Sequence, residues 1–220
     1  MDHLPAGTHP CSCTRKRHTA KLVVLTGGPG GGKTAILEMA RRYFCRHVVL
    51  LPEAASIVFS GGFPRLSNDA GHRASQHAIF AIQREMERLA LAVDDAAVIL
   101  CDRGTLDGLA YWPGTSRGLF GAHGTTLHEE LARYAAVIHV ETAGPEAYQR
   151  VGTRVESVEE ARKIDARIRA AWDKHPLRYV ISSSSNFLDK ATVALELVRT
   201  QMPDCCRTHP HVPKSQAAIP

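Results

Sequence analysis

The stretch that decides the fold is residues 22–37, Leu22-Val23-Val24-Leu25-Thr26-Gly27-Gly28-Pro29-Gly30-Gly31-Gly32-Lys33-Thr34-Ala35-Ile36-Leu37. An apolar, β-branched run stops at a glycine-rich loop, and a segment of helix-forming residues follows the loop. Residues 27–34 match the phosphate-loop pattern G-x-x-x-x-G-K-[ST] at every fixed position. A strand, a phosphate loop and a helix in this order predict an α/β domain that binds a nucleotide.

The composition of this loop suits phosphate binding. Backbone N–H groups can surround a triphosphate only where the chain adopts dihedral angles that glycine reaches without steric cost. The following helix adds unpaired amides and a positive dipole end, Lys33 is expected to reach the β and γ oxygens, and the Thr34 hydroxyl to ligate Mg²⁺. We therefore expect ATP and Mg²⁺ as cofactors. The residues expected to bind the nucleotide are Gly28, Pro29, Gly30, Gly31, Gly32, Lys33 and Thr34.

The length and composition of the chain exclude several classes of protein. The chain has 220 residues, of which 44% are hydrophobic and 22% charged, so it is long enough for one α/β domain and short for two. Apolar runs stay far below the roughly 20 residues of a membrane span, and the N-terminus lacks the apolar core of a signal peptide. We therefore expect a cytoplasmic protein without membrane partners. The net charge of +5 would permit nucleic-acid binding, but aromatic residues are only 6% of the chain and are not interleaved with basic ones, which argues against it.

The two ends of the chain differ from its middle. Residues 1–20 are polar and rich in His, Pro and Thr, and residues 201–220 are polar and contain proline. Both are predicted to be disordered, because neither has the apolar periodicity that a packed core requires. The folded domain is expected to span residues 21–200.

The six cysteines do not have the spacing of a zinc module or of a secreted disulfide framework, so we predict reduced thiols. Cys11 and Cys13, with His3, His9 and His18 nearby, have the side chains for a metal site. Since no second close pair with the spacing of a zinc finger accompanies them, a disordered leader is the favoured interpretation.

Four further apolar runs predict the remaining strands, at residues 47–51, 97–101, 134–140 and 178–182. Helices are predicted after the phosphate loop and at residues 76–89, 158–172 and 188–200. Alternating strands and helices predict a five-stranded parallel sheet with helices on both faces, the three-layer architecture of a P-loop NTPase. Residues 56–73 are expected to form a functional loop insertion, and the glycine-rich segment 113–126 either a mobile flap or an inert surface loop.

Acidic residues follow two of the predicted strands, and the carboxyl ends of parallel strands share one crevice with the phosphate loop. Asp102 has the position of a Walker B residue that reaches the Mg²⁺ shell beside Thr34. Glu53 is a candidate to orient a substrate hydroxyl and accept its proton, and Arg103 to stabilise the transferred phosphoryl group. Two alternatives stay open: Glu53 as a salt-bridging or metal-shell carboxylate, and Asp102–Arg103 as a structural pair.

The second substrate has weaker candidates. Phe80 and Gln83 are three residues apart on the predicted helix 76–89 and so lie near one face, where they are expected to line the acceptor pocket together with Asp107. The alternatives are core packing for Phe80 and solvent exposure for Gln83. The segment 148–172 is predicted to form a lid that closes over the phosphates, with Arg154 as its catalytic arginine and Arg150 as the other candidate.

These motifs together resemble a known family. They are Gly27 to Thr34, Pro52-Glu53-Ala54, Asp102-Arg103-Gly104 with Asp107, Arg154-Val155-Glu156-Ser157 leading to Trp172-x-x-His175-Pro176, and Phe187-Leu188-Asp189-Lys190. Over residues 21–200 they resemble the AAA-type ATPase/kinase domain shared by the ribosylnicotinamide-kinase module of NadR-like proteins and related predicted ATPases. The resemblance implies a sheet of the nucleoside and nucleotide kinase type, with Glu53 and Arg103 in places similar to the catalytic carboxylate and arginine of deoxynucleoside kinases. Val151 departs from the family pattern, in which asparagine is frequent before the lid arginine.

Two functions follow as hypotheses. The leading one is a small-molecule kinase that transfers the γ-phosphate of Mg·ATP to a hydroxyl of a nucleoside-like acceptor, with Lys33, Glu53, Arg103 and Arg154 as its catalytic residues. The alternative is a nucleotide-dependent switch or NTPase that acts through a protein partner. Dependence of turnover on an acceptor would distinguish them.

Overall fold

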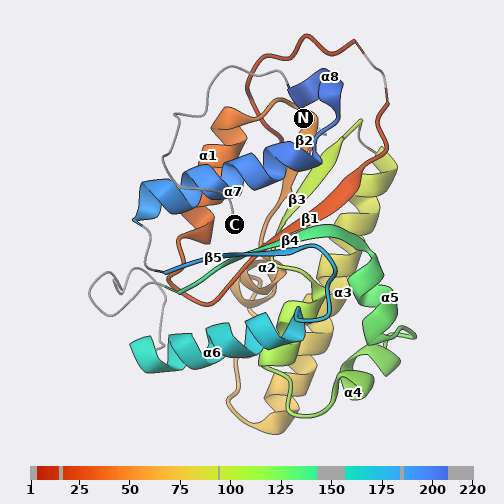
Figure 1. The fold of residues 1–220 in the computed structure, drawn as a ribbon. Coiled ribbons are helices and arrows are strands. Elements are labelled where there is room, and N and C mark those ends of the chain that lie inside the picture. The colour runs from red at the N-terminus through yellow and green to blue at the C-terminus, as the bar shows by residue number, and fades with distance from the viewer. Residues whose placement is uncertain (1–3, 15–16, 94, 143–156, 184–185, 208–220) are drawn as a thin grey trace.

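The computed structural model describes residues 4–14, 17–93, 95–142, 157–183 and 186–207, and its centre is one parallel sheet (Figure 1). The strand order is β2-β3-β1-β4-β5, and every pair is parallel. The strands are β1 (Lys21–Thr26), β2 (Val48–Leu51), β3 (Val98–Asp102), β4 (Tyr134–Val140) and β5 (Arg178–Ile181). The predicted five-stranded parallel sheet is confirmed.

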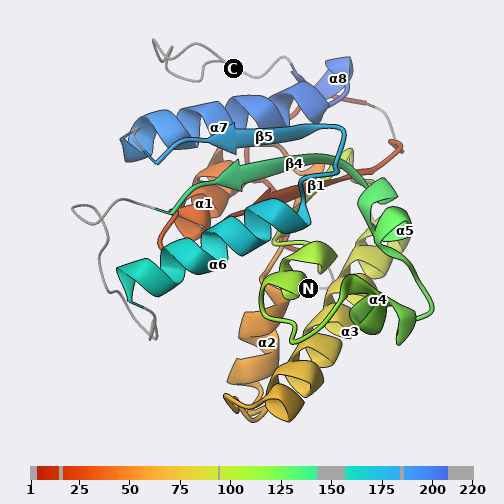
Figure 2. The same cartoon turned by 60° about the horizontal axis from the view of Figure 1, so that its bottom comes forward.

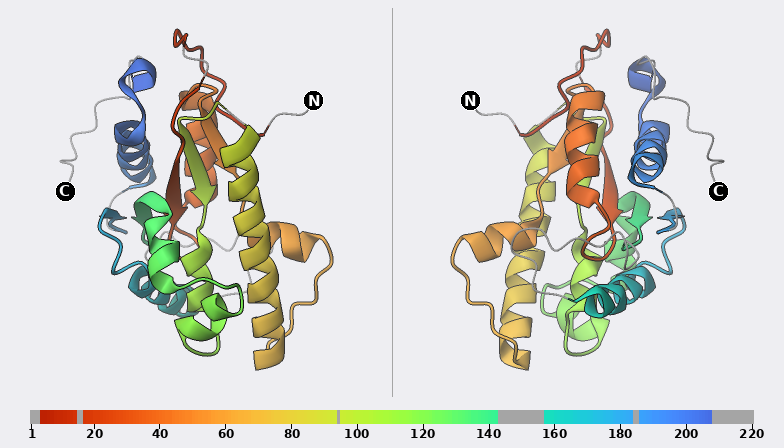
Figure 3. Two further views of the ribbon diagram at one scale, coloured as in Figure 1. Left: turned by 90° about the vertical axis from the view of Figure 1, so that its right-hand side faces the viewer. Right: turned by 90° about the vertical axis from the view of Figure 1, so that its left-hand side faces the viewer.

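Helices cover both faces of this sheet, which confirms the three-layer architecture. One face carries α1 (Lys33–Tyr43), α7 (Phe187–Gln201) and α8 (Asp204–Arg207). The other carries α3 (Asp69–Val93), the 3₁₀ helix η1 (Thr105–Ala110), α4 (Ser116–Gly121), α5 (Leu127–Ala132) and α6 (Val158–Ala171), while α2 (Ala54–Ser60) packs beside α3. Figure 2 shows the strands between α6 and α7, and Figure 3 shows the molecule from two opposite directions, with α7 (blue) and α3 (yellow) on opposite sides of the strands. In the described part of the chain, no helix combines the length and the apolarity needed to cross a membrane.

Successive side chains of β1 point to opposite faces of the sheet, and this explains how the sheet holds the two layers of helices together. Val23 and Leu25 are fully buried in the core beneath α1 and α7, whereas Leu22 and Val24 join the core on the other face with Trp172. Side chains of successive strand residues point to opposite faces, so a strand covered on both faces must be apolar throughout. The strand therefore places the start of the phosphate loop at a rigid edge of the sheet.

Two segments that were predicted as loops contain helices. Residues 56–73 hold most of α2 and the beginning of α3, which runs from 69 to 93 and is longer than predicted at both ends. Residues 113–126 hold α4, where Leu119 and Phe120 are fully buried against α3. The loop prediction is therefore wrong for both segments. Two adjacent buried apolar residues in a short helix are too few to give the periodic pattern of a helix. The glycines of this segment therefore indicated a loop instead.

The described part of the N-terminal segment is also not the disordered leader that its composition predicts. The Leu50 amide donates to the carbonyl of Pro5 at 2.8 Å, and the Gly7 amide donates to the carbonyl of Val48 at 2.9 Å. Because β2 is an edge strand, its outer backbone groups need partners, and residues 4–14 supply some of them. At the other end, α7 ends at Gln201 and α8 continues the fold to Arg207, so the predicted tail is structured up to this point. Residues 208–220 lie outside the described part.

Candidate active site

The phosphate loop connects β1 to α1, and its path depends on glycine at two positions. Gly27 has φ +130° and Gly32, the N-cap of α1, has φ +92°, a region that side chains rarely enter. A Cβ at Gly27 would lie 2.0 Å from the carbonyl oxygen of Val140 in β4. The loop can therefore run this close to the neighbouring strand only because residue 27 has no side chain.

Lys33 begins α1 and is only 8% exposed. Its Nζ donates to the carbonyl oxygens of Gly27 and Gly28, both at 2.8 Å. Burial lowers the pKa of Lys33 to about 8, and the positive charge of Arg103 adds to this effect. A poorly solvated ammonium beside a helix N-terminus favours an anion, because the anion would supply the missing counter-charge.

Asp102 ends β3 directly beside β1, in register with Leu25. Its Oδ1 is buried and has no hydrogen-bond partner among the residues that the structure describes. Burial raises the pKa of Asp102 to about 6, although Lys33 and Arg103 favour the ionised form. Asp102 and Thr34 line the same cavity. A buried carboxylate oxygen without a donor, in a cavity that a hydroxyl also lines, fits a hard cation such as Mg²⁺.

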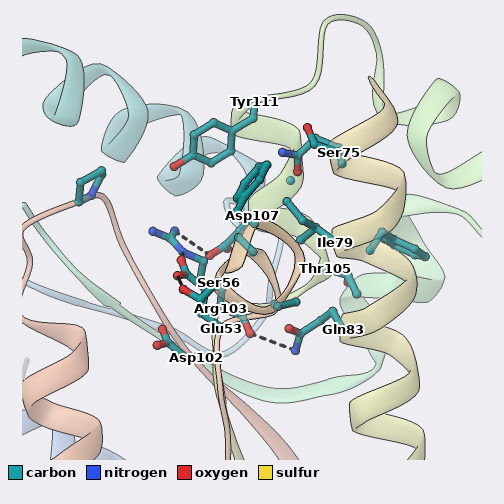
Figure 4. Close-up of a pocket in the computed structure, with 18 of the residues that line it drawn as sticks. Glu53, Ser56, Ser75, Ile79, Gln83, Asp102, Arg103, Thr105, Asp107 and Tyr111 are labelled. Atoms are coloured by element: carbon teal, nitrogen blue, oxygen red, sulfur yellow. Dashed lines mark hydrogen bonds and ion pairs between the residues drawn. The ribbon is translucent and has the colours of Figure 1, made fainter. Parts of the chain in front are cut away.

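Arg103 connects three parts of the site (Figure 4). Its Nε donates to Glu53 Oε1 at 2.6 Å, and its Nη1 donates to the carbonyl of Gly27 at 3.2 Å and lies 3.4 Å from Asp107 Oδ2. The φ of Arg103 is +71°, the one positive value at a non-glycine position within the described ranges. Such a conformation costs free energy and persists only where the surroundings require it. Here the three contacts of the guanidinium hold Arg103 in this conformation.

Glu53 immediately precedes α2, where the chain leaves β2. Its second oxygen, Oε2, accepts a hydrogen bond from the Ser56 hydroxyl at 2.6 Å. Burial alone would raise the pKa of Glu53, but the Arg103 charge and the hydrogen bonds from Ser56 and Arg103 outweigh it, so that the pKa is lowered. The carboxylate is therefore ionised at neutral pH.

Asp107 stands behind Arg103 and is 3% exposed. Its Oδ2 accepts from the Thr26 hydroxyl at 2.6 Å, and its Oδ1 accepts from the Trp172 indole at 2.6 Å. Asp107 is also part of the cavity wall. Since both of its oxygens already have donors, this carboxylate positions Arg103 and joins the end of β1 to the residue that follows α6.

A cavity of about 700 Å³ opens between the phosphate loop and the α2–α3 pair. The three residues Ser75, Ile79 and Gln83 are spaced four apart along α3 and face this cavity from one side, while Tyr111 faces it from the end of η1 (Figure 4). The outer wall also contains Phe59, Arg65, Leu66, His72 and Gln76. Cavities of this size, lined by both apolar and polar side chains as here, accommodate small organic ligands.

Phe80 and Gln83, which were predicted to line the acceptor pocket together with Asp107, do line this cavity, but both are buried. Gln83 Nε2 donates to Glu87 Oε1 at 2.7 Å and to the carbonyl of Arg103 at 3.3 Å, so it supports the strained backbone of that arginine. The Phe80 ring packs against His123, with 4.3 Å between ring centroids. Solvent exposure of Gln83 is thus excluded, and Phe80 combines core packing with a place at the cavity wall.

Sequence reasoning missed several residues of the site. Ser75 and Ile79 share the α3 face of Gln83, and their four-residue spacing was the signal that could have found them. Asp165 of α6 had no such signal: its Oδ1 accepts from the Gly28 amide at 2.6 Å and lies 3.1 Å from His139 Nε2. Burial works against its charge, but these two contacts more than compensate and leave the pKa of Asp165 lowered.

The lid prediction is only partly covered by the structure. Arg150 and Arg154 lie outside the described residues, so the role of Arg154 stays a prediction. The described part of the predicted lid is α6, which begins with the predicted capping box between Ser157 and Glu160.

Comparisons with known proteins fit this geometry. A family profile described as "AAA domain" matches residues 22–190, a range that includes the phosphate loop, Glu53, Asp102 and Arg103. The chain belongs to this AAA-domain family. Family membership and the phosphate loop together place this AAA-domain protein among the P-loop phosphotransferases and NTP hydrolases. A comparison with curated protein sequences gave no match.

Solved structures with the same fold include kinases. Thymidylate kinase from Candida albicans superposes with a TM-score of 0.56 at 14% identity, over 83% of this chain and 92% of the kinase. NadR in complex with NR gives a TM-score of 0.65 at 14% identity, over 84% of this chain, and NadR in complex with NAD and AMP-PNP gives 0.60 at 12% identity, over 90% of this chain. The AAA-domain protein spans about half of either NadR chain, 52% in both cases. At these identities the likeness shows the fold alone.

Proposed function

We propose that this AAA-domain protein is a small-molecule kinase that transfers the γ-phosphate of Mg·ATP to a hydroxyl of a nucleoside-like acceptor. The observation that carries the proposal is the cavity of about 700 Å³, which has the phosphate loop as one wall and α2 with α3 as the other. A nucleotide hydrolase needs room only for a water molecule next to the γ-phosphate, whereas a kinase needs a second, organic site there. The Glu53–Arg103 pair lies between the two walls.

The residues around the cavity have complementary roles in this proposal. Glu53 is ionised and would orient the acceptor hydroxyl and take its proton late, since the transition state of phosphoryl transfer is loose and needs little early deprotonation. Lys33 and Arg103 would stabilise the charge on the transferred group. Ser56, Asp107 and Gln83 hold Glu53 and Arg103 in place. Arg154 is the proposed lid arginine.

Mg²⁺ would be held by the Thr34 hydroxyl and the Asp102 carboxylate, whose Oδ1 is buried and has no donor among the described residues. When bound, the ion neutralises charge on the phosphate oxygens. The class of acceptor is supported by the neighbours, which include a thymidylate kinase and a NadR complex with NR, and by the mixed apolar and polar lining of the cavity.

An ADP-release assay tests the proposal. The full chain is incubated with Mg·ATP and, one at a time, nucleosides, nucleoside monophosphates and ribosylated vitamins, and each candidate is also tested by thermal shift, because a ligand that binds the native state stabilises it by mass action. We expect at least one acceptor to raise ADP release by tenfold or more over the acceptor-free rate. Slow hydrolysis that no acceptor accelerates would favour the NTPase or switch hypothesis instead, and no thermal shift with Mg·ATP would refute nucleotide binding itself.

A further inference from the structure

A second cluster of reactive side chains lies at the opposite end of the sheet from the phosphate loop. It comprises Cys11, Cys13 and His18 of the N-terminal segment, Cys45 and His47 of the α1–β2 connection, and Cys205 and Cys206 of α8. His18 precedes the start of β1 and His47 precedes the start of β2, whereas the phosphate loop and Glu53 follow the ends of these strands. The cluster is therefore separate from the candidate active site.

The sulfur atoms surround one nitrogen of His47. The distances to its Nδ1 are 3.6 Å from Cys11 Sγ, 3.6 Å from Cys45 Sγ and 3.3 Å from Cys206 Sγ. All four ligand atoms lie within 4.8 Å of one another, and three of the four residues are buried. A tetrahedral zinc ion, with Zn–S of about 2.3 Å and Zn–N of about 2.0 Å, sets its ligand atoms about 3.6 to 3.8 Å apart. The His47 distances are close to these edge lengths.

The opposite nitrogen of His47 supports the same interpretation. Its Nε2 is buried and lies 3.5 Å from Asp95 Oδ2, within ion-pair range but without the geometry of a hydrogen bond. A histidine that ligates a metal commonly directs its other ring nitrogen to a carboxylate or a carbonyl, which sets the tautomer and the ring orientation. His18 repeats the arrangement, since its Nδ1 lies 3.1 Å from the carbonyl oxygen of Asp95 and its Nε2 lies 3.5 to 3.7 Å from three cysteine sulfurs.

We propose that Cys11, Cys45, His47 and Cys206 form a structural zinc site. Three thiolates and one imidazole in a tetrahedral array select zinc among the common divalent ions, and four protein ligands leave no open position for catalysis. The ion connects α8 to the N-terminal segment and to the α1–β2 connection. These last two segments also share backbone hydrogen bonds, such as the one from the His9 amide to the Phe44 carbonyl at 2.9 Å. Together with these bonds, the ion accounts for the packing of a segment with a polar, disordered-type composition.

The spacing of the cysteines along the chain could not indicate this site. The ligands come from residues 11, 45, 47 and 206, so only the close pair at 45 and 47 has a metal-like spacing, and one such pair does not indicate a metal site. The grouping of Cys11 and Cys13 with His3, His9 and His18 was the nearest prediction. His18 does join the cluster, His9 Nδ1 lies instead 2.9 Å from the carbonyl oxygen of Pro10, and His3 is outside the described residues.

Metal analysis of the full chain, without an affinity tag and under reducing conditions, tests the proposal. We expect about one zinc ion per chain after expression with added zinc and removal of loose metal, and near-complete loss in Cys11→Ser. Cys101→Ser is the matched control, because Cys101 is a buried thiol of β3 that does not belong to the cluster. Asp95→Asn should lower the zinc affinity about 10- to 100-fold, as loss of a supporting carboxylate does elsewhere.

A second measurement keeps the test valid if Cys11→Ser fails to fold. An organic mercurial titrated into the wild-type chain should displace the zinc, which a chromogenic chelator detects, and cobalt in place of zinc should give the visible absorption of a tetrahedral thiolate complex. Absence of zinc from the wild-type chain, equal zinc content in the two cysteine variants, or a disulfide among these cysteines in the freshly purified protein would each overturn the proposal. None of these readouts depends on kinase activity, so the result is independent of the proposed function.

Discussion

Replacing Glu53 by glutamine separates catalysis from nucleotide binding at this site. In the wild type, Oε1 accepts from Arg103 Nε at 2.6 Å and Oε2 from the Ser56 hydroxyl at 2.6 Å. Glutamine can keep its oxygen toward Arg103 and turn its amide toward Ser56, whose hydroxyl then accepts. The shape and the number of hydrogen bonds are therefore retained, and what is lost is the negative charge and the proton acceptor.

The expected effect on turnover is large and that on stability is small. Positioned acid–base groups contribute about 10²- to 10⁴-fold in rate, so we expect kcat to fall by about 10²-fold, which is about 2.7 kcal/mol in activation free energy. The side chain of Glu53 is 29% exposed, so its ion pair is partly screened and its loss should cost only about 1 kcal/mol of folding stability. That stability is present above the ordinary pKa of a glutamate and disappears as the pH falls through the lowered pKa of Glu53.

The assay measures kcat by ADP release with the acceptor that the screen described above identifies, and nucleotide affinity by titration calorimetry. Ser56→Ala is the control, since it removes one hydrogen bond and leaves the carboxylate; we expect its kcat to fall less than tenfold. If Glu53→Gln kept its kcat within about twofold of the wild type with unchanged nucleotide affinity, Glu53 would be a structural carboxylate. Asp102 would then be the next candidate base, because its Oδ1 has no hydrogen-bond partner among the described residues.

Three further variants probe the parts around this carboxylate. Lys33→Ala removes a charge that we propose contacts the β and γ oxygens in both ground and transition states, so calorimetry should show weaker ATP binding and the ADP assay a lower kcat. Arg103→Lys keeps the charge but loses the planar fork and part of the contacts to Glu53, Gly27 and Asp107. We expect kcat to fall by tenfold or more; an unchanged kcat would contradict a transition-state role. Asp165→Ala leaves the Gly28 amide and His139 without their acceptor, which should cost about 1 to 3 kcal/mol in denaturant unfolding at pH 7. Because the pKa of Asp165 is lowered, this deficit should shrink as the pH falls below the ordinary aspartate range, and a deficit independent of pH would count against the charge as its source.

Much of the fold was predictable from local sequence. The phosphate loop carries its own signal, because glycine at Gly27 and Gly32 is required by the backbone conformation and by the approach of β4. The five strands are short runs of buried apolar residues, which is the pattern of a parallel sheet covered on both faces. Asp102 and Glu53 could be placed near the loop from strand ends alone, since topology brings the carboxyl ends of parallel strands together.

The tertiary structure decides which hydrogen-bond partners the polar side chains of the site have. Both Asp107 and Gln83 were candidates for contact with the substrate, and only the fold shows that their polar atoms hold Thr26, Trp172 and the backbone of Arg103. The sequence places these partners far apart along the chain, so no spacing rule connects them. Their roles depend on which side chains the packing leaves as donors and acceptors inside the protein.

The N-terminal segment shows most clearly what the sequence alone determines and what the tertiary structure decides. By itself, the sequence determined a nucleotide-binding α/β domain, because the phosphate loop and the strand pattern are local signals that hold regardless of distant partners. Composition correctly marks residues 4–14 as lacking a core of their own, since polar residues bury too little apolar surface to repay the entropy of ordering. Only the tertiary structure brings Cys11 to Cys45, His47 and Cys206, and side chains that meet from three separate segments are invisible to any pattern along the chain.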